Sequence, residues 1–171
     1  MQTYSKRALV AWGAAALSAL ALTLSVGAAA AAEGTEFMMK GYESTVSPQV
    51  QWKDSTAIPA GAKMILLYGD PKKDGPYIFR VKFPAGYKLP AHKHPDQRIV
   101  TVLQGNYWTA VGEKFEQSKL VKFTPGSFYT TEPNAPHFAW AETEVVIQEM
   151  GTGPIDSAID YVDATEDPRK K

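Results

Sequence analysis

Cysteine is absent from this sequence of 171 residues. Its absence excludes disulfide bonds, thiolate metal ligands and a cysteine nucleophile. An excess of charge of one sign is also lacking, because 18 basic and 18 acidic side chains give a formal net charge of zero. Without a surplus of Lys and Arg to neutralise phosphates, we do not expect a nucleic-acid partner.

Histidine is scarce, since the chain has only three, at His92, His94 and His137. The first two are one residue apart in a segment with strand character, so their side chains leave the same face. His137 follows a proline-rich turn later in the chain. A histidine among aromatic residues is commonly a half-buried core residue, but a shared site accounts for all three. Neutral imidazole is the commonest protein ligand for the middle and late divalent transition metals, so the sequence predicts a metal site.

A long uncharged apolar run occurs at the amino terminus, where it extends from residue 8 to residue 32 after Lys6 and Arg7. The basic start, apolar middle and alanine-rich end predict a cleaved secretory signal over residues 1–32. The expected mature protein is secreted or periplasmic and has no membrane segment after cleavage. An uncleaved membrane anchor is the alternative that a run of this length allows.

The remainder of the chain shows no sustained helical period. Residues 33–62 are expected to form an irregular lead-in with a short extended piece, residues 63–163 the folded domain, and residues 164–171 a charged tail that frays. Only residues 112–123 could hold a short helical turn. Strands are expected at 63–69, in the alternating segment 76–86, and at 88–94, 98–103, 106–111, 127–131, 137–141, 145–150 and 158–162. Short strands separated by Gly/Pro turns predict an all-β sandwich or barrel.

Two motifs in this β-rich region resemble those of a single-domain cupin. Their matching positions are Gly86, His92, His94 and Gly105 in the first, and Pro125, Gly126, Pro133 and His137 in the second. The resemblance implies a double-stranded β-helix, the jelly-roll barrel of the cupins. It also implies that the three histidines bind one divalent transition metal, which the sequence leaves open among Fe, Mn, Zn, Ni and Cu.

The first motif departs from the family pattern at Arg98, where many cupins have a glutamate as fourth metal ligand. Arginine cannot ligate a metal, so water or Gln97 is expected to complete the site. An inward Arg98 beside the metal would make a doubly positive pocket that favours a small anionic molecule. The alternative is that Arg98 points to solvent or pairs with an acidic residue on the rim, such as Asp96.

Other candidate pocket residues follow from the same barrel geometry. Ala139 would share the face of His137 and leave room beside the metal, and Tyr107 and Tyr129 could donate hydroxyl groups to a ligand. Tyr77 is a further candidate donor, and Glu132 or Glu149 a candidate acid or base. The alternative for the tyrosines is that they only fill space in the barrel.

Two functions remain open on the sequence alone. One is an exported metal-dependent enzyme acting on a small oxygenated or anionic molecule, for which the resemblance implies dioxygenase-type chemistry. The other is a non-catalytic cupin that serves as a ligand-binding or sensor module. A homodimer is expected in either case, because the apolar segment 63–69 should leave a sheet edge to cover.

Overall fold

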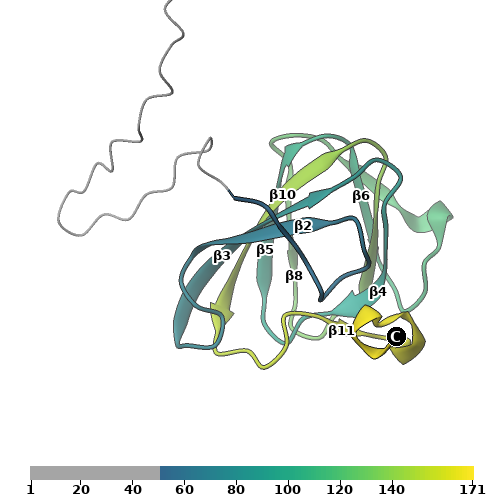
Figure 1. The fold of residues 1–171 in the computed structure, drawn as a ribbon. Coiled ribbons are helices and arrows are strands. Elements are labelled where there is room, and N and C mark those ends of the chain that lie inside the picture. The colour runs from purple at the N-terminus through teal and green to yellow at the C-terminus, as the bar shows by residue number, and fades with distance from the viewer. Residues whose placement is uncertain (1–50) are drawn as a thin grey trace, which may run out of the picture. The chain divides into compact units, whose positions relative to one another are not determined.

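The structure is a computed structural model that describes residues 51–171. The predicted signal segment, residues 1–32, and the first part of the lead-in lie outside the described residues. The described part contains short 3₁₀ helices and β-strands but no α-helix (Figure 1). None of its helices is long and apolar enough to span a membrane. The elements are β1 (Lys53–Asp54), β2 (Lys63–Tyr68), β3 (Gly75–Phe83), β4 (Lys88–Lys93), β5 (Arg98–Gln104), β6 (Tyr107–Val111), η2 (Gln117–Lys119), β7 (Val121–Phe123), β8 (Phe128–Thr131), β9 (His137–Ala141), β10 (Val145–Gly153), β11 (Asp160–Tyr161), η3 (Ala164–Glu166) and η4 (Pro168–Lys170).

The strands form two antiparallel sheets. One has six strands in the order β1-β2-β3-β10-β5-β8, and the other has five in the order β11-β4-β9-β6-β7. Strands distant in sequence are therefore neighbours, and most connections cross from one sheet to the other. This arrangement is a jelly-roll sandwich, so the predicted all-β fold is confirmed.

The core lies between the two sheets and follows from alternation along the strands. In β3, buried residues at positions 77, 79, 81 and 83 alternate with less buried residues. Phe83, Val102 and Ile147 belong to one buried cluster to which both sheets contribute. Burying a side chain of this size stabilises the fold by about 1.5–3 kcal/mol, so this cluster fixes how the sheets face each other.

The two glycines of the first motif have backbone conformations that other residues rarely adopt. Gly86 has φ +78° and donates its N–H to the carbonyl of Ala141 at 2.7 Å, which starts β4 beside β9. Gly105 has φ +80°, and a Cβ there would collide with the backbone of Glu144. Glycine adopts this left-handed conformation without steric cost. The motif glycines therefore set the two turns between which the histidine pair lies.

Two segments differ from the sequence prediction. Residues 112–123, expected to hold at most a helical turn, contain η2 and also β7. The tail 164–171, expected to fray, is bonded to the domain through Arg169. Its guanidinium donates to the Asp167 carboxylate, the Ser157 hydroxyl and the Ile159 carbonyl. Arg169 thus connects the tail to the preceding segment of the domain.

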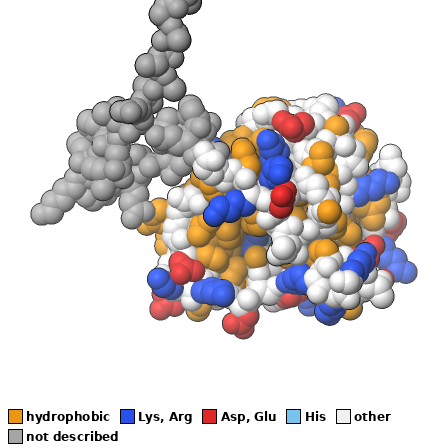
Figure 2. All heavy atoms as spheres, viewed as in Figure 1, with side chains coloured by type: hydrophobic (Ala, Val, Ile, Leu, Met, Phe, Trp, Pro, Cys, Tyr) orange, Lys and Arg blue, Asp and Glu red, His pale blue; other side chains and the backbone are white. Residues whose placement is uncertain are grey.

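The outer face of the six-stranded sheet carries a row of apolar side chains in register on four neighbouring strands. These are Tyr68, Ile78, Met150 and Ile99 on β2, β3, β10 and β5. Figure 2 shows hydrophobic side chains among the charged ones on the face that carries β2 and β3. β1 pairs with β2 only at Lys63 and Met64, so among the described residues the rest of that edge has no neighbouring strand.

Candidate metal centre

The three histidines meet in the interior of the jelly roll. His92 lies in β4 and is directly opposite His137, the first residue of the neighbouring strand β9. His94 follows the end of β4. The ring centroids of His92 and His137 are 4.2 Å apart, and that of His94 is 5.0 Å from the first and 5.1 Å from the second. One nitrogen from each ring lies within 4.8 Å of those of the other two, and all three side chains are buried.

Each imidazole is held by a backbone carbonyl on its Nδ1 side. The donations are His92 to Pro90 at 2.7 Å, His94 to Ala158 at 2.7 Å and His137 to Ala135 at 3.0 Å. A carbonyl oxygen can only accept, so Nδ1 carries the proton and the Nε2 lone pair is free. This is the tautomer of a metal-ligating histidine, whose other nitrogen is fixed by a hydrogen bond.

The surroundings keep the imidazoles neutral. Burial lowers the pKa of His92 and His94 well below the ordinary value; the next cause is His137 for the former and the positive charge of Arg98 for the latter. Burial also lowers the pKa of His137. A ligand must be unprotonated to bind a metal, so the cluster is ready to bind one at neutral pH. Three buried neutral imidazoles with free Nε2 atoms fit a divalent transition metal, and this donor set would leave coordination positions for a guest.

Arg98 lies next to this cluster and faces the interior, where only 2% of its surface is exposed. Nε donates to Asp96 Oδ1 at 3.3 Å, and Nη1 to Glu149 Oε2 at 2.8 Å. Nη2 donates at 2.7 Å to the Ala158 carbonyl, the same oxygen that accepts from His94. Tyr77 Oη completes the network by donating to Asp96 Oδ2 at 2.6 Å.

The network corrects the expected charge of the pocket. Arg98 faces inward, as one alternative held, and also pairs with Asp96, as the other held. The prediction of a doubly positive pocket is wrong, because two carboxylates surround the single guanidinium. Glu149 was foreseen only as a candidate acid or base. The alternation of β10, which buries Val145 and Ile147, places Glu149 on the same inward face and is the signal that could have located it.

The other predicted site residues differ in their burial and in their contacts. Gln97 is exposed, whereas its neighbours Asp96 and Arg98 are buried, so its side chain leaves the interior and does not join the histidines. Ala139 is buried in β9, between Leu89 and Thr109 on the adjacent strands. The remaining two candidates are tyrosines that contact each other: Tyr129 Oη donates to Tyr107 Oη at 3.4 Å.

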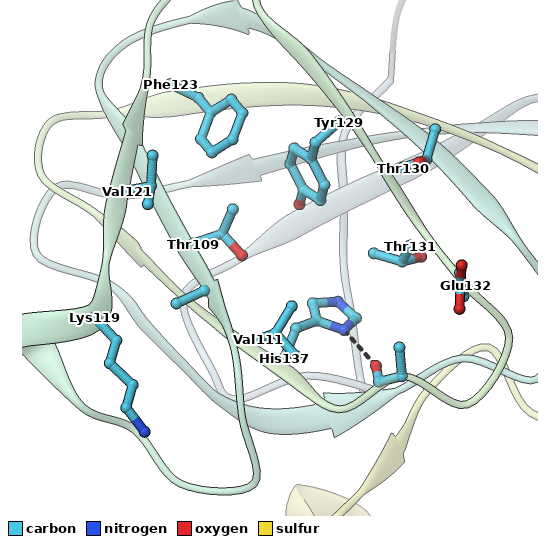
Figure 3. Close-up of a pocket in the computed structure, with 12 residues that line it drawn as sticks. Thr109, Val111, Lys119, Val121, Phe123, Tyr129, Thr130, Thr131, Glu132 and His137 are labelled. Atoms are coloured by element: carbon cyan, nitrogen blue, oxygen red, sulfur yellow. Dashed lines mark hydrogen bonds between the residues drawn. The ribbon is translucent and has the colours of Figure 1, made fainter.

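A pocket of about 560 Å³ adjoins the cluster on the side of His137 (Figure 3). Its walls combine apolar side chains from β6 and β7 with hydroxyl groups, among them Val111, Val121, Phe123, Thr109, Tyr129 and Thr131. Lys119 and Glu132 are exposed members of the lining and carry opposite charges. A much smaller cavity, about 40 Å³, borders the other two histidines, Arg98 and Glu149. The larger pocket has a volume typical of sites for small organic molecules.

Comparison with known proteins identifies the fold. No protein-family profile and no curated protein matches this sequence. Solved structures that resemble it include the polyketide cyclase RemF from Streptomyces resistomycificus, with 16% identity, 78% of this chain and 92% of that chain covered, and a TM-score of 0.60. A proposed acetylacetone dioxygenase from Methylibium petroleiphilum has 20% identity, coverages of 77% and 88%, and a TM-score of 0.55. An RmlC-like cupin from Shewanella frigidimarina has 17% identity, coverages of 66% and 91%, and a TM-score of 0.53. The chain therefore has the cupin fold.

Proposed function

We propose that this cupin binds one divalent transition metal through His92, His94 and His137 and is a metal-dependent enzyme that acts on a small oxygenated molecule. The observation that carries the proposal is that one ring nitrogen from each of the three buried histidines lies within 4.8 Å of the other two, beside a pocket of about 560 Å³. A bound metal would supply Lewis acidity and, if it is redox-active, electron transfer. Dioxygenase-type chemistry is the first candidate, because the resemblance to cupins with three histidine ligands and no carboxylate implies it.

The chain's own residues would define the charge and orientation of a guest. The three imidazoles are neutral, and the two carboxylates around Arg98 exceed its charge by one. A divalent ion would therefore leave one net positive charge in the interior. A guest with a single negative charge, such as a carboxylate or an enolate, would balance it in a low-dielectric site. The proposed ligand is thus a small molecule with at most one negative charge, and no nucleic acid.

A non-catalytic ligand-binding or sensor module is the second candidate. It is favoured by the state of the two acidic residues around Arg98, since Asp96 and Glu149 are both bonded to that arginine. Neither is a free general base of the kind that proton-transfer enzymes position near their substrate. In both proposals the protein acts outside the cytoplasm, which rests on the signal-like pattern of residues 1–32 alone.

Metal analysis of the purified protein tests the proposal. We expect about one divalent ion per chain, and its loss in His92→Ala and in His137→Ala. Lys93→Ala is the matched control, because Lys93 lies between two of the histidines on the opposite face of β4. Undiminished metal in the His92→Ala/His137→Ala double variant would contradict the site. Oxygen uptake with diketones, phenols and thiols then separates the two candidates. Consumption of oxygen supports the enzyme, whereas binding of the same molecules without oxygen consumption supports the module.

A further inference from the structure

Thr131 has a hydroxyl group that no protein group satisfies. Its Oγ1 is buried and is the one buried side-chain nitrogen or oxygen without a hydrogen-bond partner in the part of the chain that the structure describes. The residue is 7% exposed, ends β8, and lines the same pocket as His137 (Figure 3). A buried hydroxyl without a partner costs about 1–3 kcal/mol, so a protein rarely retains one that nothing binds.

Two neighbouring hydroxyl groups of the pocket, those of Thr109 and Tyr129, are already engaged. Thr109 Oγ1 donates to the Phe138 carbonyl at 3.0 Å, and Tyr129 Oη donates to Tyr107 Oη at 3.4 Å. Thr131 therefore differs from them in having both a proton and lone pairs to offer. Its position opposite Arg98 in the β5–β8 pair places it on the inward side of the sheet. A ligand oxygen beside His137 would have this hydroxyl as a buried, uncommitted partner in the pocket lining.

The mouth of the same pocket has apolar side chains. Val111 and Val121 are 73% and 59% exposed, so they present apolar surface to solvent beside the pocket. Phe123 continues this apolar surface inward. The charged residues of the lining, Lys119 and Glu132, offset each other and give no surplus to attract a multiply charged guest. The pocket is therefore polar at its inner end and apolar toward solvent.

We infer that the pocket binds an amphipathic molecule with one oxygen-bearing head and an apolar body, such as an aromatic or short-chain carboxylate, phenol or ketone. The head forms a hydrogen bond with Thr131 beside His137, and the body lies against Phe123, Val121 and Val111. Sugars and phosphorylated molecules do not fit this distribution of groups. The inference rests on the proposed function in one respect, because it takes the histidine cluster to be where the head is held.

Thr131→Val tests the inference, because valine keeps the shape of threonine and removes the hydroxyl. The probes are benzoate and phenol, with glucose and glucose 6-phosphate as the polar comparison, titrated calorimetrically into full-length metal-loaded protein. We expect benzoate or phenol to bind and the sugars not to bind. Thr131→Val should weaken binding about tenfold, the equivalent of one hydrogen bond, and Thr131→Ser should restore most of it. Thr101→Val, on the outer face of β5, is the control that should not change affinity.

Stability measured on the same variants supplies a second test. Without ligand, Thr131→Val should unfold at an equal or higher temperature than the wild type, since it removes an unsatisfied buried group. Failure of Thr131→Val to fold would show that the hydroxyl has a structural partner and would overturn the inference. Equal benzoate and phenol affinity in wild type and Thr131→Val, or preferential sugar binding, would also overturn it. Metal content distinguishes the proposals: absent metal rejects the proposed function, whereas bound metal without probe binding rejects this inference alone.

Discussion

The Ala158 carbonyl joins the two polar groups of the site at the scale of single residues. One lone pair accepts from His94 Nδ1 and another from Arg98 Nη2, each at 2.7 Å. Arg98 therefore positions the segment after β10, and that segment in turn orients one of the three imidazoles. An arginine suits this role because its planar guanidinium can bond two carboxylates and a carbonyl together.

Replacement of Arg98 by methionine should lower the free energy of unfolding by about 3–5 kcal/mol, because it leaves the buried Asp96 and the half-buried Glu149 without their shared partner. Arg98→Glu should lower the free energy of unfolding further, since a third carboxylate would lie between Asp96 and Glu149 rather than serve as a metal ligand. Urea denaturation measures both. Arg80→Met is the control, because Arg80 lies at a half-buried position on β3 and bonds Gln148. This substitution should lower the free energy of unfolding much less. Equal losses at the two sites would mean that the buried network contributes no special stability.

Stability of the metal-free protein should depend on the protonation of His92, His94 and His137. Their pKa values are lowered in the folded state, mainly by burial, whereas in the unfolded chain they lie near the ordinary value of about 6.5. Below about pH 6.5 the unfolded chain therefore binds more protons than the folded protein, and the free energy of unfolding should fall as the pH falls further.

This pH dependence can be measured by urea denaturation of metal-free protein from about pH 8 to about pH 5. The contribution is fully present above about 6.5 and is lost toward the lowered folded-state values. His137→Gln should flatten the profile, because one group that takes up a proton on unfolding is gone. A wild-type profile that stays level below about pH 6.5 would contradict the buried, neutral state of the histidines.

At the scale of elements, β10 connects the hydrophobic core to the polar site. Its inward residues change along the strand from Val145 and Ile147 to Glu149 and then Gly151. The glycine lies against the hydrogen-bonded pair of Asp96 and Tyr77, and a side chain there would collide with Asp96 Oδ2 and the Tyr77 hydroxyl oxygen. At one end of the strand Gly151 leaves space for the Asp96–Tyr77 pair, and at the other end Val145 and Ile147 pack in the core.

Gly151→Ala should lower the free energy of unfolding by about 1–3 kcal/mol, the usual cost of adding a methyl group to a filled interior. The added Cβ would displace Asp96 or Tyr77, so the variant should also weaken the hold on Arg98. Urea denaturation gives the stability. Thr152→Ala is the control, because this neighbour on the same strand is exposed. A variant as stable as the wild type would show that the Asp96–Tyr77 contact can move without cost.

The sequence predicted most strands because alternation marks a half-buried strand, as the buried and less buried positions of β3 show. It missed β7, which has only three residues, two of them exposed, and so presents no period to detect. The ordered tail was also missed. Its order depends on Arg169 reaching Ser157 and Ile159, a tertiary contact that local charge does not reveal.

At the scale of the whole molecule, the histidine cluster was predictable because scarce residues coincided with two motifs of a known fold. The charge of the pocket could not be predicted in this way. It depends on the pairing of β10 with β5, which sets Glu149 opposite Val100 and within reach of Arg98. Residues 98 and 149 are neighbours only after the sheet order is fixed, and no local pattern specifies which distant strands pair.

The apolar row on the outer sheet, Tyr68, Ile78, Met150 and Ile99, is the surface on which we propose that two copies associate. Tyr68, Met150 and Ile99 are each at least 40% exposed, and the edge of β2 beside them is largely unpaired among the described residues. A row that crosses four strands can pack against itself about a two-fold axis, which is how most homodimers form. A stable dimer needs roughly 800 Å² from each partner, so the contact would have to extend from the row onto the surrounding residues of the same sheet face.

Sedimentation of the wild type and of an Ile99→Lys/Met150→Lys variant at micromolar concentration tests this assembly. We expect a dimer for the wild type and a monomer for the variant, because two lysines on each copy would bring four like charges into an apolar contact. Both positions are exposed, so the folded monomer should retain its stability and its metal content. Val162→Lys, which adds a charge at an exposed apolar residue of the C-terminal segment, should remain dimeric. A monomeric wild type would reject the dimer, and a dimeric double variant would place the interface on another surface, with the apolar row then open to solvent.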